Sequence, residues 1–139
     1  MSWENILKRD PLKDNGKKIL NYSMQAHSYM KRVDELFELL KHPARQGAKK
    51  LAVEAKQRAD VIAKSITEIE TDPQGVASFY INDVIPEIKK EFDYLKTINK
   101  SLISVGIPEP ILTQHFPKPI DFVKMKRELE FFVDEGDLT

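Results

Sequence analysis

The chain has no cysteine, few glycines and no long apolar run, and each absence removes a class of protein. Without cysteine among its 139 residues, it has no disulfide framework, no thiolate zinc site and no cysteine nucleophile. Its five glycines are isolated, which excludes the Gly-rich phosphate loops of nucleotide-binding proteins. No apolar run reaches the length of about 18 residues that spans a membrane, and the charged N-terminus lacks a signal-peptide core. We therefore expect a cytoplasmic protein.

Histidine is also scarce, and the charges balance. The three histidines, His27, His42 and His115, form neither an H-E-x-x-H motif nor a Glu-x-x-His pair, so the sequence predicts no metal and no cofactor. Twenty-two basic residues offset 22 acidic ones. This balance argues against a nucleic-acid partner, which usually requires a strong positive field.

What the sequence does contain is helical periodicity. Apolar and aromatic residues recur at intervals of three and four between Ile19 and Leu40, which places them on one face of a continuous helix. Two stripes of similar length follow, over 51–69 and 77–102. Each stripe needs an apolar partner, and the others supply it. The sequence therefore predicts an all-α fold in which residues 14–105 form an antiparallel bundle of three long helices.

Capping residues and prolines predict where these helices begin and end. Residues 1–13 are expected to form an N-terminal arm helix that Asp10-Pro11 separates from the bundle. Asp72 suits a helix N-cap and Pro73 the first helical position, so the third helix should begin there. Pro86 lies inside that helix, where it removes a hydrogen bond, and predicts a kink or break at 82–86.

The C-terminal part is predicted from proline and from a last apolar stripe. Four prolines between residues 106 and 119 favour an extended linker or a strap across the bundle. Residues 120–134 should then form a short fourth helix, and 135–139 a frayed tail. The apolar face of that helix consists of Phe122, Met125, Leu129, Phe132 and Val133.

Two groups of residues are candidates for contact with a protein partner or for self-association. Trp3, Ile6 and Leu7 form an apolar knob on the arm, which either docks on a partner or folds back onto the bundle. The aromatic face of the first long helix is wider than the Ala-rich face of the second, so some of it is expected to remain free for a second subunit. The residues of that face are Tyr22, Tyr29, Met30 and Phe37.

Charged residues supply two further candidates. Positive charge gathers around the first hairpin, where Arg45, Lys49 and Lys50 are either a solvated face or a contact for an anion. Acidic residues on the first and third helices resemble the paired motifs of MazG-type nucleotide pyrophosphohydrolases, which hold Mg²⁺ between helices. Lys90 stands where that family needs a carboxylate, so we expect these acidic residues not to converge on one ion. They are Asp34, Glu35, Glu38, Glu87 and Glu91.

A second resemblance covers residues 62–95. The order Asp72-Pro73, Phe79-Tyr80, Ile85-Pro86, Lys89-Lys90 and Phe92-x-Tyr94-Leu95 is similar to the helical region of the XpaC-like proteins, a family labelled as involved in 5-bromo-4-chloroindolyl phosphate hydrolysis. The resemblance implies a helical accessory protein of stress or envelope biology and carries no site residues. The opening Met1–Lys8 is similar to the starts of small proteins of marine microbes and their viruses, which keeps a phage or virion component among the alternatives.

These observations favour a non-enzymatic interaction or structural protein, because the helices supply a core and surface while no motif supplies chemistry. An XpaC-like accessory protein and a MazG-like metal-dependent hydrolase are the alternatives.

Overall fold

The computed structural model describes residues 3–108, 114 and 116–137, and the side chains of residues 11–108, 114 and 116–133. Every regular element in these ranges is helical, which confirms the all-α class. The elements are α1 (Trp3–Leu40), α2 (Arg45–Glu68), α3 (Pro73–Phe79), the π-helical turn η1 (Tyr80–Val84), α4 (Ile85–Ser104) and α6 (Phe122–Asp137).

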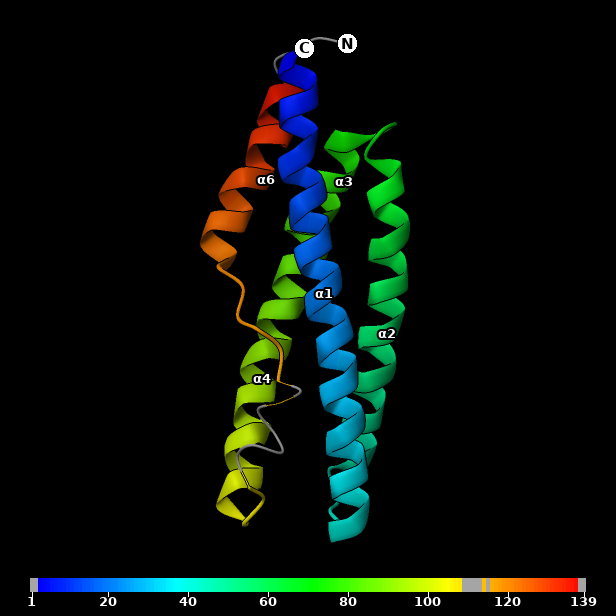
Figure 1. Cartoon of the computed structure of the whole chain (residues 1–139), viewed down its shortest axis with the longest axis vertical. Coiled ribbons are helices and arrows are strands. Elements are labelled where there is room, and N and C mark those ends of the chain that lie inside the picture. Colours follow the sequence, from blue (N-terminus) through cyan, green and yellow to red (C-terminus); the bar gives the residue numbers. More distant parts are fainter. Residues whose placement is uncertain (1–2, 109–113, 115, 138–139) are drawn as a thin grey trace.

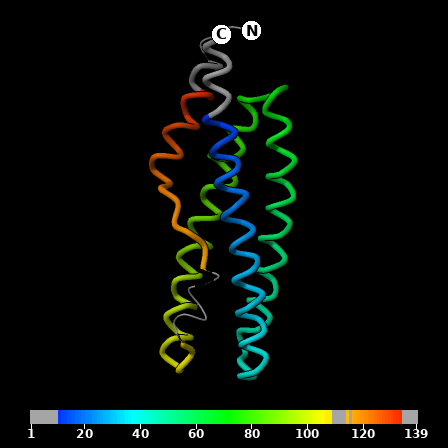
Figure 2. The backbone as a smooth tube through the Cα atoms, in the orientation of Figure 1, coloured from blue at the N-terminus to red at the C-terminus, as the bar shows by residue number. Residues whose placement is uncertain are grey.

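The molecule is elongated, and α1 runs along its whole length (Figure 1). The chain descends through α1, returns through α2 and descends again through α3, η1 and α4. After the strap, α6 ascends beside the first half of α1 and packs chiefly against α3. The backbone trace in Figure 2 shows that the α1–α2 hairpin and the end of α4 lie at the same end of the molecule.

The chain does not break at Pro11, which corrects the predicted arm over residues 1–13. Residues Trp3–Leu40 form one α-helix with Pro11 inside it. Pro11 lacks an amide hydrogen, so one backbone hydrogen bond is lost. The next residue, Leu12, is fully buried, and burying a leucine side chain stabilises a fold by about 2 kcal/mol, which offsets much of that loss. The side chains of Trp3, Ile6 and Leu7 lie outside the described residues.

The predicted helix ends are formed by local hydrogen bonds. Asp72 caps α3, because its Oδ1 accepts from the Gly75 amide at 3.0 Å, and Pro73 takes the first helical position as expected. At the end of α1, Lys41 adopts a φ of 51° and the His42 amide donates to the Phe37 carbonyl at 2.8 Å. This arrangement satisfies a carbonyl at the helix end in the manner of a Schellman cap.

Pro86 is accommodated by a π-helical turn rather than by a break. The turn η1 covers Tyr80–Val84, and α4 begins at Ile85 with Pro86 in its first turn. A proline there needs no amide partner, because the first amides of an α-helix have none within it. The predicted irregularity is therefore present, but it begins two residues earlier than 82 and the helical path continues through it.

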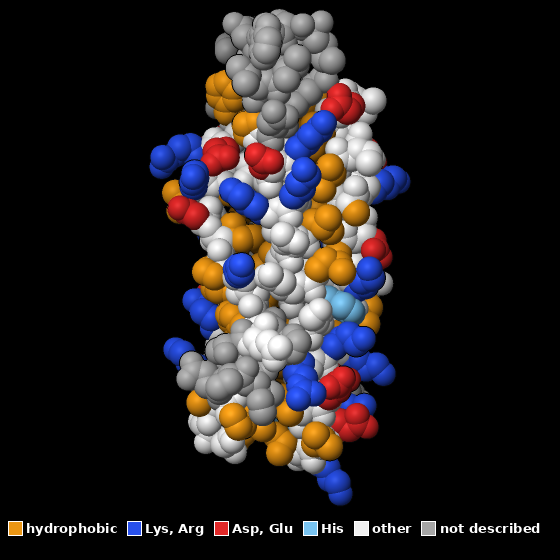
Figure 3. Space-filling model, viewed as in Figure 1, with side chains coloured by type: hydrophobic (Ala, Val, Ile, Leu, Met, Phe, Trp, Pro, Cys, Tyr) orange, Lys and Arg blue, Asp and Glu red, His pale blue; other side chains and the backbone are white. Residues whose placement is uncertain are grey.

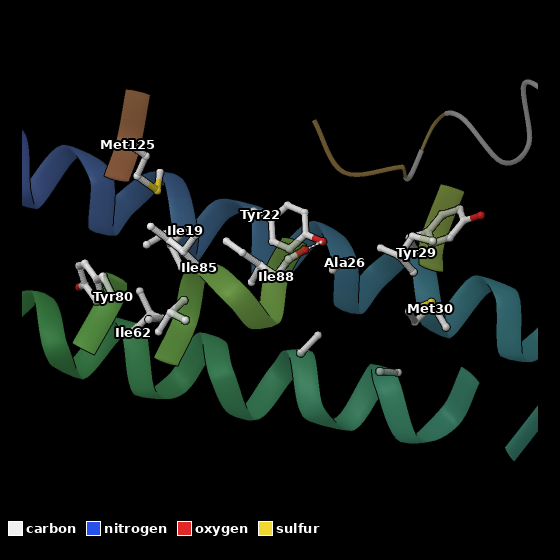
Figure 4. Packing of buried hydrophobic residues seen from close by; sticks show 14 of the residues in the cluster. Ile19, Tyr22, Ala26, Tyr29, Met30, Ile62, Tyr80, Ile85, Ile88 and Met125 are labelled. Atoms are coloured by element: carbon white, nitrogen blue, oxygen red, sulfur yellow. Dashed lines mark hydrogen bonds between the residues drawn. The ribbon is translucent and has the colours of Figure 1, made fainter. Parts of the chain in front are cut away.

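The core lies between α1, α2 and the α3–η1–α4 segment. Figure 4 shows side chains of α1, among them Ile19 and Tyr22, packed toward Ile62 of α2 and toward Ile85 and Ile88. The four residues of α1 predicted to face a partner are part of this core. Tyr22, Tyr29, Met30 and Phe37 are 2%, 0%, 0% and 4% exposed, so they are not available on the surface of the folded chain.

That prediction is wrong for those four residues because it compared only two helices. α4 and the strap also pack on α1 and cover the extra width of its aromatic face. The Phe92 ring of α4 lies 6.3 Å from that of Tyr22. The Phe116 ring of the strap meets Tyr29 edge-on, with ring centroids 5.1 Å apart.

The strap and the last helix close one side of the bundle. Of the predicted strap, residues 109–113 and 115, including His115, lie outside the described residues. The described part lies against α1, where the Lys118 amide donates to Gln25 Oε1 at 3.0 Å. Asp121 then caps α6, whose Met125, Leu129 and Phe132 are buried as predicted. α6 extends to Asp137, beyond the predicted end at residue 134.

Candidate functional site

The described surface contains a half-open groove of about 330 Å³ between α1, the strap and the first turns of α6. It lies where the extended strap runs beside α1 and then continues into α6. Volumes of this size are typical of small-ligand sites. Its walls are Asn15, Lys18, Asn21, Tyr22, Gln25, Lys118, Pro119, Ile120, Asp121, Lys124, Met125 and Glu128.

Both carboxylates of the groove are engaged by the protein itself. Asp121 Oδ1 accepts from the Lys124 amide at 3.0 Å and thereby caps α6. Glu128 Oε2 accepts from the side-chain amide of Asn15 at 3.2 Å. Asn15 is only 1% exposed, so this bond satisfies a buried polar group that would otherwise destabilise the fold. The Asn15–Glu128 bond connects α6 to α1, and the Asp121 cap fixes the start of α6.

The basic residues predicted to contact an anion lie elsewhere, at the start of α2. Arg45 is paired with Asp34 at 3.3 Å and with Glu38 at 3.4 Å, which neutralises most of its charge. Lys50 lies 3.9 Å from Glu54, and Lys49 is exposed. The structure therefore brings Arg45 together with acidic partners and does not gather the three basic residues around a cavity.

The acidic residues of the MazG-like pattern are separated into pairs with arginine. Glu35 accepts from Arg32 at 3.1 Å, and Asp34 and Glu38 face Arg45. Glu91 and the exposed Glu87 both face Arg58, Glu87 at 3.6 Å. Within the described part of the chain, no group of three or more His, Cys, Asp or Glu residues could hold a metal ion.

A buried ion pair, absent from our sequence analysis, lies in the middle of the bundle. The Arg58 guanidinium on α2 donates to both carboxylate oxygens of Glu91 on α4, at 3.0 and 2.8 Å, and each side chain is 5% exposed. Arg58 Nε also donates to Ser23 Oγ on α1 at 2.8 Å. The Tyr22 ring lies 5.7 Å from the guanidinium carbon. One ion pair thus connects three helices.

A signal for this pair was present in the sequence. Arg58 lies three residues after Ala55 and four before Ile62, and Glu91 lies three after Ile88 and four before Leu95. Each charge therefore occupies a position of its helix's apolar stripe, where a charged residue requires a partner. Opposite charges within two facing stripes indicate a buried pair.

Burial also changes the acidity of three tyrosines. Desolvation raises the pKa of Tyr22 well above its ordinary value, and the Glu91 charge raises it further. Burial likewise raises the pKa of Tyr29 and of Tyr80. Their hydroxyls have partners within the protein: Tyr22 donates to the Ile88 carbonyl at 3.4 Å, Tyr29 to Asn99 Oδ1 at 3.0 Å, and Tyr80 to Ser65 Oγ, whose own hydroxyl donates to the Ile62 carbonyl. These phenols act as neutral hydrogen-bond donors in the core.

A second surface feature is an apolar end, where α1 and α4 both finish. It comprises Leu39, Leu40, Ile103 and Val105, which are 79%, 48%, 38% and 64% exposed. Figure 3 shows apolar side chains at this lower end, and Lys and Arg side chains interspersed with acidic ones over α1 and α6. The sequence predicted that Leu40 belongs to the buried stripe, but as the last residue of α1 it is 48% exposed.

Comparison with known proteins adds no further guide to the site. A scan against protein-family models, a search of curated proteins and a search of solved structures each find no match to this chain. No helix among the described residues is long and apolar enough to cross a membrane.

Proposed function

We propose that this chain is a non-enzymatic structural module that associates with a second copy of itself through the apolar end. The proposal treats α1, α2 and the α3–η1–α4 segment as an antiparallel three-helix bundle, with α6 as a short fourth helix that stiffens it. In such a protein the helices supply a rigid body and the exposed end supplies the contact.

The observation that carries the proposal is the exposure of four large apolar side chains at one end. Leu39 and Val105 are the most exposed of these, at 79% and 64%. Single exposed apolar residues are ordinary, but a group of them at the tip of a rod indicates a contact with another molecule. Covering such side chains removes apolar area from water, which is the main driving force of association.

A second copy is the partner that the charges favour. The chain has a formal net charge of +0, so two copies do not repel each other at long range. The last turns near this end carry both signs, with Glu35 and Glu38 on α1, Lys41 after it and Lys100 on α4, all exposed. A two-fold contact places each patch against its own copy, so a patch of mixed sign is complementary to itself.

Sedimentation velocity over a wide range of concentration tests the proposal. The unmodified chain should shift from monomer to dimer as concentration rises. Leu39→Glu with Val105→Glu should weaken the dimer by about tenfold or more, because each copy would bury a charge in the contact. Val123→Glu is the matched control, since Val123 is 69% exposed but lies on α6.

Circular dichroism should show equal helix content and similar melting for all three proteins. A chain that stays monomeric at every concentration would contradict the proposal. Equal weakening of the dimer by the control would also contradict it, because the contact would then not lie at the apolar end.

A further inference from the structure

We infer that the groove between α1, the strap and α6 is a binding site for a small organic anion with an apolar body. This inference is independent of the association proposed above. It rests on the shape of the groove, on the state of its charged groups and on the apolar surface at its base.

The cations of the groove outnumber its carboxylates, and each carboxylate already has one oxygen engaged by the protein. Lys18, Lys118 and Lys124 line it, and none of the three ammonium groups has an ion pair within the part of the chain that the structure describes. Asp121 and Glu128 each accept a hydrogen bond from the protein, as described above. A ligand entering the groove therefore meets more free donors than free acceptors, which favours a carboxylate, sulfonate or phosphate group.

Amide groups add to this donor excess. Gln25 uses its carbonyl oxygen to accept from the Lys118 backbone, so its NH₂ group stays available beside the lysines. Asn21 is exposed at the same wall. Together these side chains can surround an anionic head from α1 and from the strap, two segments that are remote in sequence.

The remaining lining is apolar and suits the body of the ligand. The Tyr22 hydroxyl donates to the Ile88 carbonyl inside the protein (Figure 4). It is therefore not available to a ligand in the groove. Tyr22 and Met125 are each only 2% exposed and close the groove from beneath. The exposed Pro119 and the partly buried Ile120 supply its apolar surface. Small-ligand sites commonly combine an apolar base with a few convergent polar groups. The groove has both parts, which distinguishes it from a solvated cluster of lysines.

The probe for this site is 8-anilinonaphthalene-1-sulfonate, an organic anion with an apolar body whose fluorescence rises on burial. Titration of the whole chain should give saturable binding of one molecule. Lys18→Gln with Lys124→Gln should weaken this binding by about tenfold or more, because two charge-assisted contacts are lost. Asn21→Phe should block it by filling the mouth of the groove, with the melting temperature unchanged.

Lys49→Gln with Lys50→Gln is the matched control, because it removes the same charge from α2, away from the groove. It should leave the dissociation constant within about twofold of the unmodified value. Amide chemical shifts in a ¹⁵N NMR titration should change first at residues 18–25 and 118–124. Shifts centred on Leu39 and Val105, or equal weakening by the control, would overturn the inference.

The same anionic head-group chemistry occurs in free metabolites and in anionic lipids. A second experiment distinguishes these two kinds of ligand. Co-sedimentation with phosphatidylglycerol vesicles should be weak and indifferent to the Lys18 and Lys124 substitutions, since the site is recessed. If those substitutions abolish vesicle binding and leave dye binding unchanged, the lysines serve a lipid surface and the inferred small-molecule site is wrong.

Discussion

The middle of the bundle and its hairpin end contain the same kinds of residues in opposite environments. In the middle, Arg58 and Glu91 are 5% exposed and bind each other through two hydrogen bonds. At the hairpin end, Arg45 pairs with Asp34 at 3.3 Å, with 43% of the arginine side chain exposed. The contrast teaches that an ion pair's effect on stability depends on whether water can replace a lost partner.

The largest expected effect comes from breaking the buried pair. Glu91→Ala leaves the buried Arg58 guanidinium with only the exposed Glu87 carboxylate, 3.6 Å away, and should lower the free energy of unfolding by about 3 kcal/mol. Arg45→Ala removes the exposed counterpart and should lower it by less than about 1 kcal/mol. Urea denaturation measures both. Similar losses in the two variants would show that the environments are not distinct.

A double substitution serves as the control for Glu91→Ala. Arg58→Met with Glu91→Leu removes both charges and keeps apolar volume, so no buried charge is left unpaired. Its stability should lie close to that of the unmodified chain or above it. A double variant as unstable as Glu91→Ala would mean that packing, and not the unpaired charge, accounts for the loss.

A second comparison uses one glycine in a close helix contact and one at the hairpin end. A Cβ at Gly16 would lie 3.0 Å from the Tyr80 hydroxyl and 3.0 Å from Ile66 Cγ1, in a buried helix contact. Gly16→Ala should therefore lower stability by about 1–2 kcal/mol despite alanine's higher helix propensity. At Gly47 the nearest atom would be the Tyr94 hydroxyl at 3.9 Å. Gly47→Ala should raise stability by up to about 1 kcal/mol. Thermal melts that move in the same direction would contradict the distinction.

The smallest expected effect is a dependence on alkaline pH. Burial, with the Glu91 charge adding to it, raises the folded-state pKa of Tyr22, while the unfolded value stays near about 10. The stabilisation is complete below pH ~10, and above it the unfolded state releases a proton that the folded state keeps, so stability falls. Tyr22→Phe should reduce this fall by about 1 kcal/mol per pH unit. Urea titrations above pH 10 measure the effect, and Tyr94→Phe, at an exposed tyrosine, is the control. If Tyr94→Phe reduced the loss of stability at high pH as much as Tyr22→Phe, the pH dependence would not come from the burial of Tyr22.

The sequence predicted those parts of the fold that depend on local chemistry. The stripe from Ile19 to Phe37 is buried, Asp72 and Pro73 begin a helix, and α4 ends just before Gly106, whose φ is +101°. Each of these depends on neighbours within a turn or two. The break predicted at Pro11 was wrong, because the helix is continuous there and the burial of Leu12, a tertiary contact, offsets much of the local cost of proline.

The candidate sites depended on non-local contacts and were harder to predict. Phe116 covers Tyr29 from a position 87 residues later in the chain, so no helical period could predict that Tyr29 is covered. The groove exists only because the strap meets Gln25 and α6 meets Asn15. The Arg58–Glu91 pair could have been predicted from the positions of the two residues in their apolar stripes, but Glu91 was considered only as part of the acidic set.

The contact of Arg58 with Ser23 and Glu91 also sets the vertical alignment of the helices. The first half of the buried face of α2 is rich in alanine, with Ala48, Ala52, Ala55 and Ala59, and over that half a slide of one turn would exchange one alanine for another. The same slide would move Arg58 by about 5.4 Å, far outside hydrogen-bond distance of both partners. The alanines alone specify the position of α2 weakly. Arg58 therefore adds to the alignment that the Ser65–Tyr80 hydrogen bond also favours, because a misaligned bundle would leave a buried charge without its partner.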